Sequence, residues 1–204
     1  DKGQRETGCD PWHQRCRGFF CFSAENTAKD IWMTEIILIL GGARSGKSRF
    51  AVDFVRKGRD RAVYIATAPA CDSEMRLRIQ KHKKSRPKNW LTIETGTDII
   101  GALKKIPASR GAIIIECIGT YVSNLMRDGF GGAKITANIK QILKQARALN
   151  RKFIIVSNEV GGGLVPETAS GRLFRDITGN INQIIARCAD QVYLVTAGIP
   201  ARLK

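Results

Sequence analysis

The sequence predicts a three-layer α/β fold with a mostly parallel central sheet. From residue 33 onward, short continuous apolar runs alternate with segments that have a helical pattern. The apolar runs are rich in β-branched residues, as are strands that are buried on both faces of a parallel sheet. Strands that alternate with helices favour a parallel sheet covered by helices. With 204 residues and a 43% hydrophobic fraction, the chain suits one domain with a sizeable core.

The first half of this region contains three predicted strands. Ile36–Leu40 (IILIL) is the first, and a glycine-rich turn separates it from a helix over about 47–57. Asp72 or Ser73 can cap a later helix, which runs through a basic segment until Pro87 stops it. The other expected elements are the strands Ala62–Ala66 and Leu91–Glu94 and a short helix over Asp98–Lys105.

The second half continues the alternation. A buried strand is expected at Ala112–Cys117 (AIIIEC), followed by a loop at Gly129–Ala133 (GFGGA). Gly161–Gly163 and Pro166 indicate a mobile loop. The remaining expected elements are a helix over Ile135–Leu149, a strand at Phe153–Val156, a helix over Ile177–Ala189 and a last strand at Val192–Val195.

Residues 1–32 differ from the rest of the chain. They show no sustained hydrophobic period, and their five basic and five acidic residues cancel. We therefore expect a poorly ordered extension over 1–32 and a single domain over 33–204, with Met33 as the natural start. The net charge of +16 then belongs to that domain. A domain this basic favours polyanionic partners: nucleotides, nucleic acid or an anionic membrane surface.

The six cysteines indicate a reducing, cytoplasmic setting. No pair has the C-x-x-C spacing, and the N-terminal cysteines with His13 do not match common zinc spacings. Cys117 ends an apolar run and is expected to be a buried thiol. No apolar run approaches the length of a membrane span.

A phosphate-binding loop follows the first strand. GGARSGKS fits G-x-x-x-x-G-K-[ST] in the strand–loop–helix context that this motif requires. Its glycines let the backbone N–H groups and the helix N-terminus face phosphate oxygens. Lys47 can reach the β and γ phosphates, and Ser48 can supply a hydroxyl to Mg²⁺. We expect a nucleoside-triphosphate site made by Gly41, Gly42, Ala43, Arg44, Ser45, Gly46, Lys47 and Ser48.

Polar residues at two other strand ends are expected to complete this site. Glu116 closes AIIIE and is the best candidate to act on Mg²⁺, directly or through water. The alternative is a surface carboxylate at a strand end. Asn158 and Glu159 follow the strand at 153–156 and are candidates for substrate or nucleotide contacts, because strand ends line the ligand crevice of parallel sheets.

The segment RIQKHKKSRPKNW, residues 78–90, surrounds His82 with positive charge. A helix places Arg78 and His82 on one face. Nearby cations disfavour imidazolium, and neutral imidazole is a nucleophile. The same cations attract a triphosphate and stabilise departing pyrophosphate. Covalent catalysis by His82 at phosphorus is therefore one interpretation.

Two other interpretations of this segment are open. A basic helix is often simply a solvated face. A nucleic-acid surface is the other alternative, with Arg86 and Trp90 stacking on bases. However, the sequence carries no recognisable signature of a DNA- or RNA-binding module.

Five segments recur in the order found in one enzyme family. They are GGARSGKSRFA (41–51), YIATA (64–68), EMRLRIQKHKKSRPKNW (74–90), VSNEVGGGLVPE (156–167) and LFRDITGNINQIIARCADQVYLVTAGIP (173–200). Together they resemble the bifunctional adenosylcobinamide kinase/adenosylcobinamide-phosphate guanylyltransferase family of cobalamin biosynthesis. The combination of H-x-x-x-R-P, N-E-V-G and F-R-D-x-x-G-x-x-N-Q is more specific than the P-loop alone. The resemblance covers nearly all of 34–204 and none of 1–32.

This resemblance implies a RecA-like P-loop fold, a homotrimer and two reactions. ATP or GTP phosphorylates the aminopropanol hydroxyl of adenosylcobinamide. GMP then passes from GTP to that phosphate through a GMP–histidine intermediate, giving adenosylcobinamide-GDP and pyrophosphate. The family histidine corresponds to His82. Besides the P-loop, the nucleotide contacts implied by the resemblance are Ala66, Thr67, Ala68, Lys83, Lys84, Ser85, Arg86, Glu94 and Glu116.

The chain departs from the family pattern in two places. Gly119 stands where family members often carry threonine, and the connection at 127–134 is short and rich in glycine. Both departures concern corrinoid contacts and not the nucleotide site. Two other functions are weighed beside the bifunctional enzyme: a P-loop small-molecule kinase without guanylyl transfer, and a nucleic-acid-binding NTPase.

Overall fold

The computed structural model describes residues 34–57, 61–70, 72–84, 86–107 and 109–204, without the side chain of Arg78. The expected extension over 1–32, Met33 and Ser85 lie outside these ranges. The described elements, in chain order, are β1 (Ile36–Gly41), α2 (Lys47–Lys57), β2 (Ala62–Ala66), α3 (Ser73–Lys84), β3 (Leu91–Glu94), α4 (Ile99–Lys104), β4 (Ala112–Glu116), α5 (Ile118–Arg127), α6 (Gly132–Ala148), β5 (Lys152–Asn158), α7 (Ala169–Cys188), β6 (Gln191–Thr196) and β7 (Ile199–Arg202).

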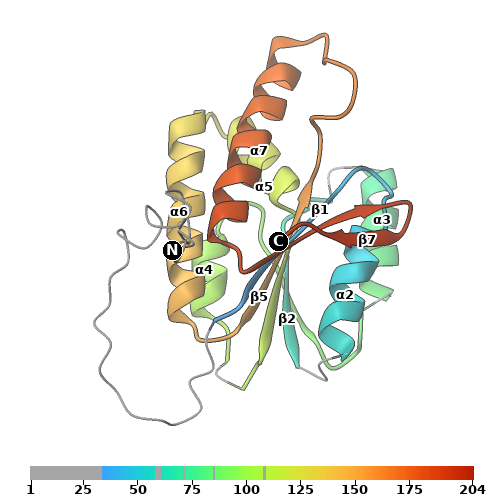
Figure 1. Cartoon of the computed structure of the whole chain (residues 1–204), viewed down its shortest axis with the longest axis vertical. Coiled ribbons are helices and arrows are strands. Elements are labelled where there is room, and N and C mark those ends of the chain that lie inside the picture. The colour runs from blue at the N-terminus through green and yellow to red at the C-terminus, as the bar shows by residue number, and fades with distance from the viewer. Residues whose placement is uncertain (1–33, 58–60, 71, 85, 108) are drawn as a thin grey trace, which may run out of the picture. The chain divides into compact units, whose positions relative to one another are not determined.

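The strands form one seven-stranded sheet in the order β3-β2-β4-β5-β1-β6-β7. Every neighbouring pair is parallel except β6 and β7. In Figure 1, α2 covers one face of the sheet, and α4, α5, α6 and α7 cover the other. The predicted three-layer α/β fold with a mostly parallel sheet is therefore confirmed. The carboxyl ends of β1, β2, β4 and β5 share one edge, which positions the site described below.

Two apolar clusters hold the layers together, one on each face of the sheet. Successive strand side chains point to opposite faces. Leu38 of β1 therefore packs in the cluster with α4–α7, whereas its neighbours Ile37 and Ile39 pack in the cluster with α2. All six residues of β1 are buried, which explains its continuous apolar run.

The basic helix α3 begins and ends where the sequence predicts. Asp72 caps it, because Oδ1 of Asp72 accepts a hydrogen bond from the Met75 N–H at 2.7 Å. The helix ends at Lys84, before Pro87. None of its described side chains is fully buried. Of the helices that the structure describes, none is long and apolar enough to cross a membrane.

Three helix predictions need correction. Helix α5, Ile118–Arg127, was not predicted. The strand expected to end at Cys117 ends at Glu116 instead, and Cys117 caps α5. Its Sγ accepts a hydrogen bond from the Thr120 N–H at 3.4 Å. Cys117 is therefore half-buried rather than a buried thiol. The expected loop at 129–133 is shorter, because α6 begins at Gly132. Helix α7 begins at Ala169, well before Ile177, because Thr168 caps it there.

Two strand predictions are also wrong in part. The strand β6 is not the last one, since β7 pairs antiparallel with it and forms an edge of the sheet. All four residues of β7 are exposed, so no burial pattern in the sequence indicated it. Asn158 is the final residue of β5 rather than a residue that follows the strand.

Candidate active site

The P-loop, residues 41–48, joins β1 to α2 as predicted. Arg44 and Gly46 have φ angles of 55° and 96°, so the chain curls through left-handed conformations. The carbonyl of Ser45 accepts from the Gly198 N–H at 2.8 Å, and the turn between β6 and β7 thereby supports the loop. Lys47 is buried, and its Nζ donates to the Gly42 carbonyl at 2.9 Å. The ammonium group is thus held inside the loop.

The two leading glycines of the loop make a matched test of its geometry. A Cβ added to Gly41 would clash with Ser45 Oγ and lie 2.7 Å from the Val195 carbonyl oxygen, whereas a Cβ on Gly42 meets no described atom within 4 Å. We expect Gly41→Ala to lower the free energy of unfolding by about 1–3 kcal/mol and to weaken nucleotide binding, because the loop must shift. Gly42→Ala should preserve the free energy of unfolding. Thermal melting and titration with a fluorescent GTP analogue measure the effects, and equal behaviour of the two variants would contradict the geometry.

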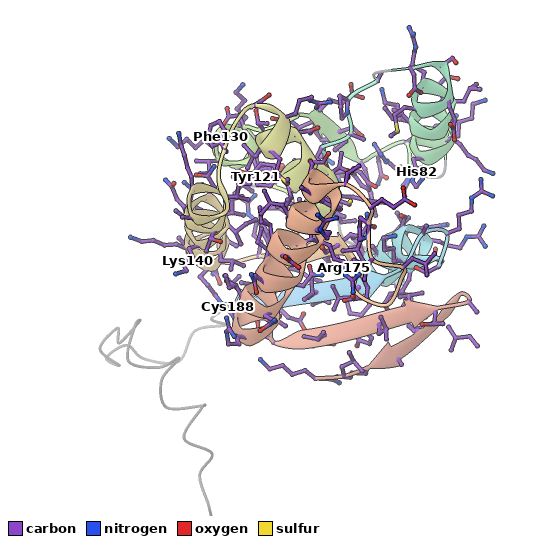
Figure 2. All side chains as sticks on the ribbon, turned by 90° about the horizontal axis from the view of Figure 1, so that it is seen from above. His82, Tyr121, Phe130, Lys140, Arg175 and Cys188 are labelled. Carbon is purple, nitrogen blue, oxygen red and sulfur yellow. The ribbon has the colours of Figure 1, made fainter. Side chains whose placement is uncertain are left out.

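Glu116 connects three elements at the end of β4. The Ser48 hydroxyl donates to its Oε1, and the Tyr64 hydroxyl donates to its Oε2. His82 Nδ1 lies 4.0 Å from Oε1. His82 belongs to α3, and in Figure 2 it lies on the side of α3 that faces α2. The structure therefore brings together Ser48, Glu116 and His82, which the sequence singled out separately.

The surroundings of His82 differ from the purely cationic ones expected. A carboxylate, Glu116, faces its Nδ1 side. The His82 side chain is 47% exposed and Glu116 only 12%, so the ring can be reached from solvent while the carboxylate is largely enclosed. The accessible His82 ring therefore lies close to Ser48, the last residue of the P-loop, through their shared neighbour Glu116.

Tyr64 is a site residue that sequence reasoning missed. Burial, and after it the charge of Glu116, raise the pKa of the Tyr64 hydroxyl well above its usual value of 10.0. The Arg86 guanidinium acts in the opposite direction, lying 3.5 Å from the centre of the tyrosine ring. The Tyr64 hydroxyl therefore stays protonated at neutral pH and donates a hydrogen bond to the Glu116 carboxylate.

The oxygen atoms around Glu116 fit a magnesium ion. Ser48 offers a hydroxyl and Glu116 a carboxylate, side by side. Mg²⁺ takes such hard oxygen donors, usually one or two protein ligands together with water and substrate phosphates. In the part of the chain that the structure describes, no group of three or more His, Cys, Asp or Glu could hold a metal. With Ser48 and Glu116 as protein ligands, a magnesium ion would take its other ligands from water and nucleotide phosphates.

Thr67 ties the ends of β2 and β4 together. Its N–H donates to the Glu116 carbonyl at 2.9 Å, and its Oγ1 accepts from the Cys117 N–H at 2.8 Å. The side chain is fully buried, so it supports the scaffold rather than facing a ligand. Asn124 of α5, which the sequence did not indicate, donates to the carbonyls of Thr67 at 2.8 Å and Gly96 at 2.9 Å.

A cavity of about 310 Å³ lies between the backbone after β2 and helix α3. Ala68, Lys83 and Glu94 all line it, and Lys83 forms an ion pair with Glu94. Three of the predicted nucleotide contacts thus meet at one hollow. Gln80 and Thr95 also line it and were not indicated by the sequence.

Other residues of the basic segment lie elsewhere. Arg86 stacks on Tyr64, and its Nη1 donates to Thr92 Oγ1 at 3.3 Å. Trp90 packs in the apolar cluster under α2 and is only 8% exposed. The nucleic-acid interpretation required both groups to be available for stacking on bases. Neither the Trp90 ring nor the Arg86 guanidinium is available in this way. Lys84 is exposed at the end of α3.

The end of β5 adjoins the P-loop, as expected from the strand order. The Glu159 N–H donates to the Gly41 carbonyl at 3.0 Å, and the Glu159 carboxylate accepts from the Gly161 N–H at 2.7 Å. The carbonyl of Asn158 accepts from Asn182 Nδ2 at 3.0 Å. Asn158 and Glu159 therefore border the phosphate loop from the side of α7.

Known proteins resemble this chain in sequence. Residues 37–203 match the family described as cobinamide kinase / cobinamide phosphate guanyltransferase. The bifunctional adenosylcobalamin biosynthesis protein CobU of Escherichia coli K12 is 36% identical over 182 residues, which cover 83% of this chain and 99% of that protein. The protein of the same name from Salmonella typhimurium is 38% identical with the same coverage. The bifunctional adenosylcobalamin biosynthesis protein CobP of Pseudomonas aeruginosa is 34% identical over 167 residues, covering 82% of this chain and 96% of that protein.

A KaiC-like protein from the hyperthermophilic archaeon Pyrococcus horikoshii OT3 superposes with a TM-score of 0.49 at 15% identity, covering 79% of this chain and 71% of that chain.

Proposed function

Because the chain belongs to the cobinamide kinase / cobinamide phosphate guanyltransferase family, we propose that it performs both of that family's transfers on adenosylcobinamide. It is an enzyme of cobalamin biosynthesis with kinase and guanylyltransferase roles, and nucleoside triphosphates are its substrates. ATP or GTP phosphorylates adenosylcobinamide, and GMP from GTP is then added to give adenosylcobinamide-GDP. The observation that carries this proposal is the meeting of the P-loop, Glu116 and His82.

The kinase step takes place at the P-loop. Its backbone donors and Lys47 hold the β and γ phosphates. The acceptor hydroxyl oxygen forms a bond to the γ phosphorus, the bond from that phosphorus to the bridging oxygen breaks, and the nucleoside diphosphate leaves. The hydroxyl proton passes to solvent. Ser48 and Glu116 would hold Mg²⁺, which neutralises phosphate charge when bound.

The guanylyl step uses His82 as nucleophile. A ring nitrogen bonds to the α phosphorus of GTP, and the bond to pyrophosphate breaks. An oxygen of the cobinamide phosphate then bonds to the same phosphorus, the phosphorus–nitrogen bond breaks, and His82 is regenerated. The 47% exposure of His82 supports this role, because a nucleotide can reach the ring. Lys83 and Glu94, at the cavity beside α3, are proposed nucleotide contacts.

The remaining proposals concern the setting of this chemistry. The other proposed nucleotide contacts are Ala66, Thr67, Ala68, Lys84, Ser85 and Arg86. Thr67 contributes by positioning its neighbours Ala66 and Ala68, because its side chain is buried in the scaffold. We also propose a catalytic domain over 33–204, a homotrimer and a cytoplasmic location. The family resemblance supports the trimer, and the cysteine usage supports the location.

Doubly labelled GTP tests the two transfers together. Adenosylcobinamide is incubated with the enzyme and GTP that carries distinguishable labels in its α and γ phosphates. We expect both labels in the isolated corrinoid product. A product with the γ label alone would identify a kinase without guanylyl transfer. GTP hydrolysis that nucleic acid stimulates, with neither label in the corrinoid, would favour the nucleic-acid-binding NTPase.

A further inference from the structure

One polar face of α7 lies against the end of β5, beside the P-loop. Arg175, Thr178 and Asn182 follow one another at spacings of three and four residues and therefore share this face. Asn182 fixes its position: Oδ1 accepts from Ser157 Oγ at 2.7 Å, and Nδ2 donates to the Asn158 carbonyl at 3.0 Å. Asn158 is the partner of Gly41 across the parallel pair β1 and β5. The face therefore lies next to the first residue of the P-loop.

Two buried polar atoms on this face have no partner. Arg175 Nη1 and Thr178 Oγ1 find no hydrogen-bond acceptor or donor among the residues that the structure describes. Thr178 is fully buried. Buried polar atoms without a partner are costly and uncommon in folded proteins, and a charged donor is the most costly kind. Of the two, Arg175 Nη1 belongs to a charged donor group, which suits an oxygen-rich anion.

Hydrogen bonds connect Arg175 to the P-loop. Its Nη2 donates to the Gly161 carbonyl at 2.9 Å. The Gly161 N–H donates to the Glu159 carboxylate at 2.7 Å, and the Glu159 N–H donates to the Gly41 carbonyl at 3.0 Å. In Figure 2, Arg175 projects from α7 toward α2, whereas Lys140 lies on the other side of α7. The guanidinium therefore lies against the loop after β5, which borders the P-loop.

We propose that Arg175 binds the phosphoryl group that the kinase step delivers and the guanylyl step consumes. This inference rests on the proposed function. The group starts as the γ phosphate of the nucleotide and ends as the phosphate of the corrinoid, so the same guanidinium can serve in both half-reactions. Arginine suits the role because its planar donors match phosphate oxygens. Arg175 forms no covalent bond; it holds and orients the phosphoryl group.

The charges facing this subsite are mixed. The Glu159 carboxylate lies one hydrogen-bonded step away, but the Gly161 N–H occupies one of its oxygens. Lys47 supplies positive charge from within the loop. His82 acts on the α phosphate from α3, on the other side of Glu116. Arg175 therefore bears on formation of the GMP–enzyme adduct only through the binding of GTP, whereas His82 forms the bond itself.

Three assays on Arg175→Ala test the inference. They measure phosphorylation of adenosylcobinamide by ATP, GMP transfer to supplied adenosylcobinamide phosphate, and adduct formation from GTP alone. We expect kcat of the first to fall, and KM for the corrinoid phosphate in the second to rise, each about tenfold or more, the effect of losing a hydrogen bond to a charged group. With GTP at saturating concentration, adduct formation should stay near the wild-type rate. Arg175→Lys, which keeps the charge, should recover part of both losses.

Arg172→Ala is the matched control. Arg172 lies on the same helix, and its Nη1 bonds to the exposed carbonyls of Pro166 and Glu167 at 3.0 and 2.6 Å. This variant should behave as wild type in all three assays, and thermal melting compares the stability of the variants.

The outcomes separate the possible ligands. Loss confined to the kinase assay assigns the subsite to the γ phosphate of the nucleotide, and loss confined to GMP transfer assigns it to the corrinoid phosphate; both support the subsite. Unchanged kinase and transfer rates would overturn it, and so would an equal loss of adduct formation, which indicates a general structural role. Wild-type enzyme that fails to transfer GMP would instead overturn the proposed function, and the kinase assay would then decide the role of Arg175.

Discussion

His82→Ala should abolish GMP transfer while phosphorylation of adenosylcobinamide survives. Removing the nucleophile of a covalent mechanism removes the intermediate itself, so we expect transfer to fall by roughly 10³-fold or more. The kinase step does not use the imidazole, and the P-loop, Ser48 and Glu116 remain in place. Its rate should therefore stay near that of the wild type. Separate assays with ATP and adenosylcobinamide, and with GTP and the corrinoid phosphate, measure the two rates.

Lys81→Ala is the control for this variant. Lys81 is the exposed neighbour of His82 on α3 and carries the same charge as the other basic side chains there. Its removal should leave GMP transfer close to wild type. If the two variants lost transfer equally, the basic surface and not the imidazole would be the active feature. If His82→Ala lost kinase activity to the same extent as GMP transfer, the proposal that His82 serves the guanylyl step alone would be wrong.

Lys47→Ala should impair both half-reactions. The ammonium group lies buried inside the P-loop, beside the Gly42 carbonyl, where it can reach phosphate oxygens. Loss of a preorganised charge of this kind costs on the order of 10²–10³-fold in rate. Because GTP must bind before His82 can attack it, adduct formation should fall together with phosphorylation. Steady-state kinetics of each half-reaction measure the losses.

Lys57→Ala controls for charge and helix position. Lys57 is the exposed last residue of α2, the helix that Lys47 opens. Its replacement should change neither activity by a measurable factor. Normal guanylyl transfer by Lys47→Ala would show that GTP is bound for that step outside the P-loop.

Local signals in the sequence predicted the P-loop and α3 well. The loop is a contiguous motif, and β1 precedes it as a continuous apolar run. Asp72 and Pro87 limit α3 on both sides through cap chemistry and a missing N–H. Such features depend on neighbouring residues alone, so a single sequence is enough to recognise them.

Weaker or unusual local signals explain the missed elements. Cysteine is an uncommon N-cap, so the start of α5 at Ile118 was not recognised. The first turns of α7 lack the apolar spacing that marked its later part, and only Thr168 indicates the true beginning. The strand β7 is exposed along its whole length and shows no alternation.

The contacts of the site depend on the order of the strands, which a local pattern does not contain. Tyr64 has the appearance of a core residue of β2, yet the pairing of β2 with β4 brings its hydroxyl to Glu116. The same convergence places a carboxylate beside His82, where the sequence indicated only cations. The position of Arg175 likewise depends on the fold, which buries its Nη1 without a partner among the described residues.

Locating the GMP on the protein tests the central claim most directly. The enzyme is incubated with GTP alone, digested under alkaline conditions that preserve a phosphorus–nitrogen bond, and analysed by peptide mass spectrometry. We expect one added GMP, attached to His82. Attachment to Lys83 or Lys84 instead, or no GMP on a preparation that completes the overall transfer, would contradict the account.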